Sequence, residues 1–472
     1  MLGLFGTLNL AARSLQTQQQ GVEVAGHNLA NASNPAYSRQ RLEIQTSTPL
    51  QTNIGALGTG ADAVAIRQLR DTLLDQQIQG ETSATSFLQS QQTALQYAQA
   101  AIGEQLQGTS LTTDATSNVG SPGGLASDLS GLFNSFQDLS TAPSLMTSRQ
   151  EVISQAQQLT TQFNQVDQRL TSINDQLNQS VQTEVGSANQ LLSDIAGLNH
   201  QIAGSEAGTG AANDLRDLRQ QKVEALSQLI NVQFSTDSNG EAHLSAGGQL
   251  LVTGGTVQDT LETYDSGGGQ LLVRTAGAGN PLTPSAGSIA GTIDVRDGAL
   301  KSLRDGLNHL ATQIISQVNT AYRSGYDLNG NTGADFFTGT NASDIGVNAA
   351  LANDPSSLQT SGSAGAAGDN QIALALAQMA NTKQAALGNQ TFAQSYNGTV
   401  TDLGTALNSV NSKLSDEQVV QTMLKDQRNS VSGVSIDDEM TNLVMFQRAF
   451  QASAHLVSVV DQMLSIVVTL GQ

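Results

Sequence analysis

The chain has 472 residues, and its 20 Lys and Arg against 40 Asp and Glu give a formal net charge of −20. It contains no Cys and no Trp, and only 4% of its residues are aromatic. The negative charge opposes binding to nucleic acid or to an anionic membrane surface. A chain without Cys forms no disulfide, thiol nucleophile or zinc–thiolate site. We therefore expect proteins as partners and no nucleic acid.

The first 33 residues predict a helix that pairs with another helix. Pro35 ends it, because a proline disfavours helical geometry at the preceding Asn34. Asn28, Asn31 and Asn34 can bond backbone groups at this end, and the interpretation that they only stop the helix stays open beside a role in assembly. Apolar residues recur along the helix at heptad spacing, as in one strand of a coiled coil: Leu8, Ala11, Leu15, Val22, Ala25 and Leu29.

An extended stretch follows the turn and begins with Tyr37 and Arg39. In it Leu42 and Ile44 alternate with polar neighbours, which is the period of a half-buried strand. A large aromatic and a guanidinium that come directly after a helix stop are suited to contacts between chains. We therefore predict that Tyr37 and Arg39 contact neighbouring copies.

Helical patterns dominate the middle of the chain. A Gln-rich helix is predicted over 66–106, a Gly/Ser/Thr-rich loop continues to Gly124, and an amphipathic helix covers 125–139. Two later stripes have helical spacing as well: Leu300, Leu303, Leu307, Leu310 and Ile314, then Tyr396, Val400, Leu403, Leu407, Val410 and Leu414. Together these patterns indicate an elongated bundle built from both halves of the chain.

The most regular helical pattern extends from Val152 to Ile202, where apolar residues step by four and three. Pro143 suits the first turn of this helix. An unbroken helix of about sixty residues would be ~90 Å long at 1.5 Å per residue. Gly186 and Gly197 are the positions at which we expect any bend.

Between Val232 and Val295 the period changes to two, which predicts a β insertion in the helical body. Asp237-Ser238-Asn239-Gly240 predicts a hairpin turn. We expect the irregular sequence from 325 to 368 to pack near these strands.

The C-terminal helix is predicted to begin after Ser435, which can cap it. Asp437, Asp438 and Glu439 place carboxylates in its first turn, where they meet the positive end of the helix dipole. Asp461 and Gln462 interrupt its apolar run, so we expect no membrane insertion. One apolar stripe continues almost to the last residue: Leu443, Phe446, Phe450, Val457, Val460, Leu464 and Val467.

The two terminal stripes predict a paired coiled coil whose stability depends on neighbours. Ordering a residue costs roughly 1–2 kcal/mol of backbone entropy, whereas burying a Leu or Phe returns roughly 1.5–3 kcal/mol. The burial of so few seam residues does not offset the entropy cost of ordering two long helices that keep one face in water. We therefore expect both ends to be loose in a single copy and to fold on assembly. An ordinary core helix pair is the alternative.

The sequence offers no pattern typical of catalysis or of cofactor binding. The five His residues are scattered, and no phosphate loop, dinucleotide fingerprint or nucleophile elbow is present. Asp327-Leu328-Asn329-Gly330-Asn331 opens like a calcium loop, but the later ligand positions fail, because Thr338 stands where a bidentate Glu is needed. We predict no enzyme, no cofactor and no metal site.

Two motifs carry a family resemblance. The stretch HNLANASNPAYSRQ at residues 27–40 resembles the N-terminal signature of flagellar axial proteins, and SGVSIDDEMTNLVMFQRAFQA at 432–452 resembles their C-terminal one. The Tyr-Ser-Arg-Gln form is most similar to the hook-associated protein 1 family. The match covers roughly residues 1–45 and 430–472. Both ends match together, which is more specific than either end alone.

The resemblance implies a non-enzymatic structural subunit at the distal end of the hook, where it joins hook to filament. It implies partners as well: further copies in a ring-like homo-oligomer, the hook protein, a neighbouring hook-associated protein, and an export chaperone on the C-terminal helix. Secretion through the flagellar type III apparatus without a cleaved signal follows too. Another axial subunit of hook, rod or filament, a soluble coiled-coil scaffold, and a secreted enzyme stay open as alternatives.

The predicted fold is mainly α, with paired terminal helices, an elongated helical body and an inserted small β domain. The predicted assembly residues are the two terminal stripes together with Asn28, Asn31, Tyr37 and Arg39. The predicted domains are a terminal assembly domain (1–60 and 431–472), a helical body (61–230, 296–325 and 369–430) and a β-rich outer domain (231–295 and 326–368).

Overall fold

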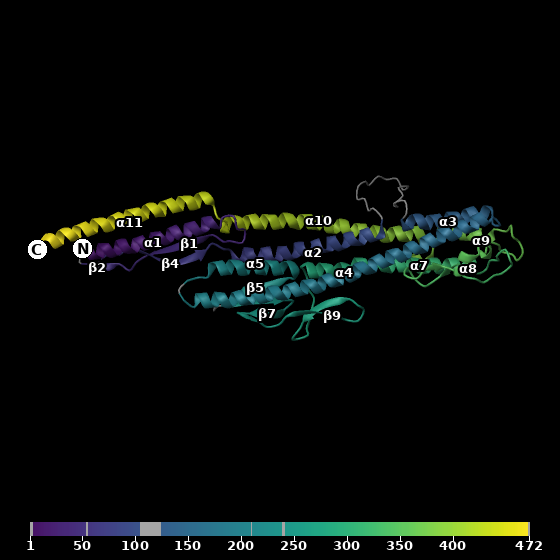
Figure 1. Ribbon diagram of the computed structural model, residues 1–472, viewed down its shortest axis with the longest axis horizontal. Coiled ribbons are helices and arrows are strands. Elements are labelled where there is room, and N and C mark those ends of the chain that lie inside the picture. Colours follow the sequence, from purple (N-terminus) through teal and green to yellow (C-terminus); the bar gives the residue numbers. More distant parts are fainter. Residues whose placement is uncertain (1–2, 53–54, 104–123, 209, 238–240, 471–472) are drawn as a thin grey trace.

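The molecule is an elongated rod in which a narrow arm extends from a wider helical body (Figure 1). The computed structural model describes residues 3–52, 55–103, 124–208, 210–237 and 241–470. The first turn of α1 (Leu4–Ala30) and the last turn of α11 (Ile436–Leu470) lie together at the tip of the arm. The predicted fold class is confirmed, because the terminal helices are paired and the β part is inserted in a helical body.

The arm has three layers, with α1 between α11 and a β-ribbon. In the ribbon, β1 (Gln40–Thr46) pairs antiparallel with β4 (Ala61–Gln68). The short strands β2 (Leu50–Thr52) and β3 (Gly55–Leu57) pair between them. Because β1 and β4 form one ribbon, the predicted boundary at residue 60 would divide a pair of hydrogen-bonded strands, and the arm extends at least to Gln68.

The helix predicted over 66–106 begins later than expected. Its first three residues finish β4, and α2 (Thr72–Ile102) starts after Asp71, whose carboxylate accepts hydrogen bonds from the backbone N–H groups of Leu73 and Leu74. An N-cap of this kind satisfies donors that a first helical turn leaves free. Residues 104–123, which hold most of the predicted loop, lie outside the described residues.

The body is a bundle of helices drawn from both halves of the chain (Figure 1). Its helices are α2, α3 (Leu125–Thr141), α4 (Met146–Glu206), α5 (Asn213–Leu229), α6 (Ser288–Val295), α7 (Lys301–Tyr322), α8 (Ala349–Asn353), α9 (Gln371–Gln378) and α10 (Phe392–Ser432). A π-helical turn (Arg296–Leu300) joins α6 to α7, and short 3-10 helices cover Pro355–Ser357, Met379–Asn381 and Ala385–Leu387. The helices predicted over 125–139 and from the stripes of α7 and α10 are confirmed.

The longest of the described helices of the body is α4. Its 61 residues form one continuous helix, about 90 Å long at 1.5 Å per residue, with no break at Gly186 or Gly197. Every apolar position of the predicted stripe is buried. Buried residues between 152 and 177 belong to the core shared with α2, α3, α7 and α10, and those between 181 and 196 to the core under the β strands. Pro143 lies in the turn before the helix rather than in its first turn.

The β insertion lies along the side of α4 (Figure 1). One sheet has the order β5-β6-β7-β8, and a second has the order β11-β10-β9. Their strands are β5 (Val232–Thr236), β6 (Ala242–Ala246), β7 (Gln249–Thr253), β8 (Thr256–Val257), β9 (Leu261–Asp265), β10 (Leu271–Thr275) and β11 (Pro281–Leu282). Residues 238–240 of the predicted hairpin turn are outside the described residues, but β5 and β6 on either side of it do pair. The insertion ends earlier than predicted, because residues 288–295 form α6.

The prediction that residues 325–368 pack near the β strands is wrong. Phe336 and Phe337 are buried in the core of the helical bundle, where Phe136 of α3 and Tyr322 of α7 surround Phe336. The short strands β12 (Phe337–Thr338) and β13 (Gly346–Val347) pair there, at the end of the rod away from the arm. The two phenylalanines therefore anchor this segment in the helical core rather than in the β part.

A buried guanidinium closes that end of the body. Arg149 of α4 is 0% exposed, and it donates to the carbonyl oxygens of Pro143 at 2.7 Å and Leu358 at 2.6 Å and to Thr360 Oγ1 at 2.8 Å. Burial lowers the pKa of this guanidinium. Its three partners come from the turn before α4 and from the segment before α9, so one side chain joins them.

We expect Arg149→Met to lower the free energy of unfolding of the body by about 1–3 kcal/mol for each carbonyl left unsatisfied. Urea unfolding followed by circular dichroism measures it. Arg323→Met is the matched control, because Arg323 pairs with Asp335 at the surface and such pairs contribute less than about 1 kcal/mol. Equal losses in the two variants would contradict the role assigned to Arg149.

Two carboxyl groups meet between α2 and α10. Burial raises the pKa of Glu81 to about 7, and the hydrogen bond and charge of Glu417 add to the rise. The protonated form of Glu81 therefore stabilises this contact at low pH, and the stabilisation is lost as pH rises through about 7. Hydrogen exchange in α10 around residue 417, corrected for intrinsic rates, should accelerate between about pH 5 and about pH 8. In Glu81→Gln the step should disappear, because the titrating group is removed; an unchanged step would assign it to another group.

Candidate assembly site in the terminal arm

The two terminal helices approach each other through small residues of α1. Ala11 and Ala25 are buried, and the Oγ atoms of Ser14 and Ser453 lie 2.8 Å apart. At Gly21 the ring of Phe446 takes the place of a side chain, because a Cβ there would lie 2.6 Å from its Cδ1. We call this contact the cis seam; on α1 it consists of Ala11, Ser14, Gly21, Ala25 and Asn28.

The predicted α1 stripe is displaced by one residue from the cis seam. Leu8, Leu15, Val22 and Leu29 are only half-buried, whereas Ala11 and Ala25, which we added to the same stripe, lie in the seam. The heptad leucines are the stronger pattern in the sequence. The small residues nevertheless form the seam, because they allow the two helices to approach more closely. The leucines remain partly in solvent.

On α11 most of the predicted stripe faces α1. Val460 is 3% exposed, and Leu443, Phe446, Val457 and Leu464 are half-buried. Two predicted positions lie further out: Phe450 is 38% exposed and Val467 is 56% exposed. The predicted cap is present, since the amide of Asp438 donates to Ser435 Oγ at 3.3 Å. In one copy α11 packs on α1, and α1 packs on the ribbon. That both ends are loose in a single copy stays a prediction.

Asn28 joins three segments at the inner end of the seam. Its Nδ2 donates to the carbonyl oxygen of Gln40 at 2.8 Å and to Glu439 Oε2 at 3.0 Å. Its Oδ1 accepts from the Tyr37 hydroxyl at 2.7 Å and from the Gln40 amide at 2.9 Å. Asn28 therefore ties α1 to β1 and to the first turn of α11. Asn31, by contrast, donates from its side chain only to the carbonyl of His27, which fits a helix stop.

Tyr37 and Arg39 make their contacts within the chain. Tyr37 is buried, and burial together with nearby carboxylates raises its pKa. Arg39 Nε lies 2.7 Å from Glu439 Oε1, and that carboxylate side chain is 3% exposed. The backbone N–H of Arg39 also donates to the carbonyl of Ser432 at the end of α10. The predicted contact of these two residues with a neighbouring copy stays a prediction, and the local sequence gave no sign of Glu439 as their partner within the chain.

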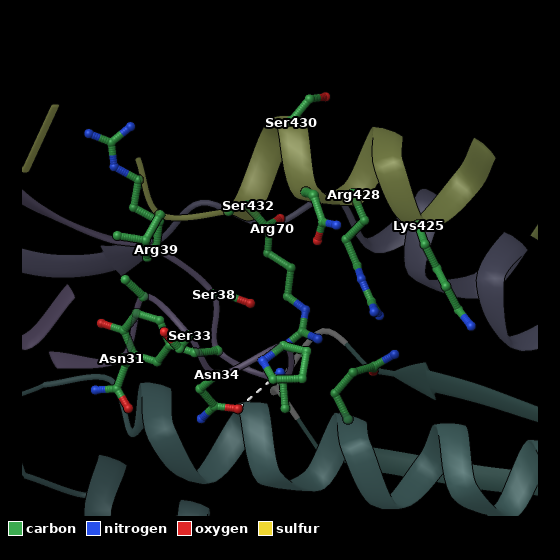
Figure 2. Close-up of a pocket in the computed structure, with 18 of the residues that line it drawn as sticks. Asn31, Ser33, Asn34, Ser38, Arg39, Arg70, Lys425, Arg428, Ser430 and Ser432 are labelled. Carbon is green, nitrogen blue, oxygen red and sulfur yellow. Dashed lines mark hydrogen bonds between the residues drawn. The ribbon is translucent and has the colours of Figure 1, made fainter. Parts of the chain in front are cut away.

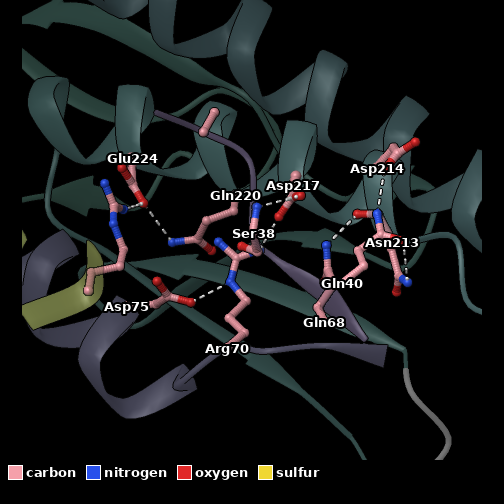
Figure 3. Close-up of polar contacts among 12 residues, drawn as sticks. Ser38, Gln40, Gln68, Arg70, Asp75, Asn213, Asp214, Asp217, Gln220 and Glu224 are labelled. Carbon is pink, nitrogen blue, oxygen red and sulfur yellow. Dashed lines mark hydrogen bonds and ion pairs between the residues drawn. The ribbon is translucent and has the colours of Figure 1, made fainter. Parts of the chain in front are cut away.

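A second polar cluster connects the arm to the body (Figure 3). Asp217 of α5 accepts from the Ser38 amide at 3.0 Å and from Arg70 NH1 at 3.0 Å, and Arg70 also binds Asp75 of α2 at 2.6 Å. Burial raises the pKa of Asp217, while the bonds from Ser38 and Arg70 lower it. Gln40 completes the cluster by donating to Asp214 at 2.8 Å.

A groove of about 840 Å³ lies beside this joint, between α5, the 31–39 turn and the end of α10. Figure 2 shows Lys425 and Arg428 extending from α10 toward α5. Arg428 is neutralised by Glu224, whose Oε1 lies 2.6 Å from NH1. The groove is polar, open and lined mainly by hydrogen-bonding groups. It therefore resembles a contact between two parts of the chain rather than an enclosed ligand site.

Two places contain residue types that bind metal ions. Asp327 accepts from the amides of Asn329 and Asn331, so its carboxylate makes a turn. Asp237, Glu241 and His243 bring ligand atoms within 4.8 Å of one another, which the scattered histidines of the sequence did not suggest. That cluster is open to solvent and sits beside residues outside the described ranges.

One helical region, 392–469, contains a window apolar enough to cross a membrane by length and composition, with 6% of it buried. The apolar residues concerned lie on α11. Half of that helix faces α1, and its remaining apolar surface is the part that another chain or a membrane would cover.

Comparisons with known proteins find relatives of the helical body, of the C-terminal end and of nearly the whole chain. A profile described as the flagellar hook-associated protein FlgK helical domain matches residues 111–337, and one described as the flagellar basal body rod FlgEFG protein C-terminal region matches 425–470. Flagellar hook-associated protein 1 of Bacillus subtilis is 28% identical over 99% of this chain and 98% of its own length. This chain is therefore similar to hook-associated protein 1 over nearly its whole length.

Other relatives named hook-associated protein 1 match this chain over different shares of their length. The Escherichia coli protein is 23% identical over 95% of this chain and 96% of its own. The Salmonella typhimurium protein is 28% identical over 70% of this chain but only 59% of its own length. A solved structure of the flagellar hook junction protein FlgK from Burkholderia pseudomallei has a TM-score of 0.62 at 18% identity and covers 76% of this chain and 100% of that one. That likeness shows the shared fold.

We expect Gly21→Val to separate α11 from α1, because the added side chain occupies the space of the Phe446 ring. Hydrogen exchange of α11 amides between residues 443 and 457 should accelerate while the body is unchanged. Gly26→Val is the matched control, since it makes the same change in helix propensity and no atom lies within 4 Å of a Cβ there. If both variants exchange alike, the Gly21 contact does not hold the seam.

Proposed function

We propose that this chain is a structural subunit of the bacterial flagellum that joins the hook to the filament. The observation that carries the proposal is the match to hook-associated protein 1 of Bacillus subtilis over nearly the whole of both chains. Relatives with that name are structural proteins of the flagellum, and no catalytic pattern was found in this sequence. The chain acts by assembly rather than by catalysis.

The terminal arm is the part that we propose for assembly. Both helices of the arm keep apolar side chains in solvent in a single copy, among them Met445, Met463 and Ile466, which are 54%, 50% and 58% exposed. Side chains of this kind are stabilised when another chain covers them. The proposed partners are further copies, the hook protein and a neighbouring hook-associated protein, and an export chaperone on α11 before assembly.

The proposed location is outside the cell, at the distal end of the hook, after export through the flagellar type III apparatus. The net charge of −20 and the absence of Cys suit a chain that functions among protein subunits rather than on nucleic acid. The three-part division into terminal arm, helical body and β-rich outer part stays a proposal, with the arm extended to include β4 and with residues 288–295 and 326–368 moved to the helical body.

The match of residues 425–470 to a rod-type C-terminal region favours a second candidate, another axial subunit. Electron microscopy of cells lacking this chain separates the two. We expect hooks without filaments and filament protein in the medium. Missing hooks would support a rod or hook subunit, and normal filaments would refute a structural role at the junction.

We expect Val457→Asp to abolish incorporation of the chain and leave filaments absent, because it places an unpaired charge in the cis seam. Ser458→Asp is the control, since it adds the same charge one residue along on the exposed side of α11. Complementation of the deletion strain, scored by motility and microscopy, measures both. Full function of Val457→Asp would contradict the use of this seam in the assembled state.

A further inference from the structure

A second pocket, of about 760 Å³, lies where β4, α2, α5 and β5 meet. The described residues that line it carry four guanidinium groups, those of Arg67, Arg70, Arg216 and Arg219, and one carboxylate, that of Asp75. The whole chain has a net charge of −20, so this excess of positive side chains is local. We call this cavity the arginine pocket. A cleft lined by charges of one sign attracts ions of the other.

Three of the four guanidinium groups are paired with carboxylates of the same chain. The nitrogen–oxygen distances are 2.9 Å for Arg67 with Glu43, 2.6 Å for Arg70 with Asp75 and 2.8 Å for Arg216 with Glu206. The pair with Arg70 also offsets the charge of Asp75, which would otherwise repel an anion. These three arginines therefore need no further counter-ion.

Arg219 of α5 is the exception. Among the described residues, no carboxylate lies within ion-pair distance of its guanidinium. Its NH1 donates to Asn199 Oδ1 at 3.0 Å, and its Cζ lies 4.9 Å from the centre of the Phe234 ring. Both of these contacts are with neutral groups, and they orient the side chain without compensating its charge.

The surroundings of Arg219 are unfavourable for a positive charge. Burial lowers the pKa of Arg219 to about 10, and the like charges of Arg216 and Arg70 contribute to the fall, while Glu206 opposes it. Because a pKa of about 10 is still well above neutral pH, the side chain remains a cation. A half-buried cation without a counter-ion is stabilised by an anion that enters the pocket.

Gln79 of α2 gives a second, independent observation. Its side chain lines the same pocket and is only 4% exposed. Within the part of the chain that the structure describes, no group forms a hydrogen bond with its amide. Buried amides are normally hydrogen-bonded, because an unsatisfied one loses the free energy of its contact with water. The N–H groups of this amide can donate to an oxyanion.

We propose that the arginine pocket binds a small anion through an oxyanion group, a carboxylate or a phosphate, which pairs with Arg219 and accepts a hydrogen bond from Gln79. A guanidinium binds such groups through two parallel N–H···O bonds. The volume falls in the range of about 300–1,000 Å³ that small-molecule sites occupy, so the remainder of an organic anion also fits. The site goes beyond the proposed function and does not depend on it.

The bound anion would join the arm to the body, because β4 belongs to the arm and α2 and α5 to the body. The test uses the purified full-length chain, titrated with sodium acetate or with sodium phosphate while sodium chloride keeps the ionic strength constant. Hydrogen exchange is followed by mass spectrometry. We expect the amides of residues 213–220 to exchange about tenfold more slowly at an anion concentration ten times the dissociation constant. Amides of α9, far from the pocket, should not respond.

The two salts distinguish the two oxyanion groups. Protection by acetate would assign a carboxylate ligand, and protection by phosphate alone would assign a phosphate. Exchange that neither salt slows would overturn the proposal.

Substitutions locate the site. In Arg219→Gln the protection should be lost, whereas Arg219→Lys, which keeps the charge without the planar fork, should need more anion for the same effect. Arg323→Gln is the matched control, because it removes one positive charge from an exposed ion pair elsewhere on the body and should behave like the unsubstituted chain.

Gln79→Leu keeps every charge of the pocket and tests the site even if Arg219→Gln does not fold. It should weaken binding of the anion while the chain stays folded by circular dichroism. Protection that persists unchanged in a folded Arg219→Gln, or in Gln79→Leu, would place the anion elsewhere and refute the assignment.

Discussion

The close approach of α1 to α11 is the constraint on which the arm depends. Gly21 allows the Phe446 ring to lie directly on the α1 backbone, and Ser14 meets Ser453 about two helical turns away. Small residues bring two helices close enough for their larger neighbours to lie beside the seam rather than in it. Because the leucines are left at the side, one copy retains apolar surface for another.

A buried carboxylate sets where this seam begins. Glu439 lies in the first turn of α11, where the helix dipole favours a negative charge, and it is held by Arg39 and Asn28. An isolated buried charge would be costly, but here both oxygens have partners from separate segments. The same junction orients α11 relative to α10, since the amide of Arg39 binds the last carbonyl of α10 at Ser432. Arm and body are thus positioned by polar contacts that permit little variation in geometry.

The body gives the arm a rigid support. One helix, α4, passes through both hydrophobic cores, so the β insertion and the far end of the bundle are fixed to a common axis. Arg149 closes the end away from the arm, and the cluster of Arg70, Asp75 and Asp217 closes the end next to it. This arrangement places the β part along the side of the rod, where it does not interfere with the terminal helices.

The sequence by itself determined the helices, because their apolar periods are long and each stripe has one buried side. It predicted α4 and the buried rows of α7 and α10 residue by residue, and the paired terminal helices with the cap at Ser435. The alternation from Val232 onward also predicted strands correctly. These features depend on local periodicity, which a single chain displays without knowledge of its neighbours.

Only the tertiary structure decided which stripe of α1 forms the seam and which partners the polar residues choose. Leu8, Leu15, Val22 and Leu29 are the stronger local signal, but close packing favours Ala11, Gly21 and Ala25, and the choice depends on the ring of Phe446 from the other end of the chain. Asn28 and Arg39 meet Glu439 across more than four hundred residues of sequence. Phe336 and Phe337 enter the helical core for the same reason. Contacts between distant segments leave no periodic trace, so local pattern predicted the elements and the folded chain assigned their roles.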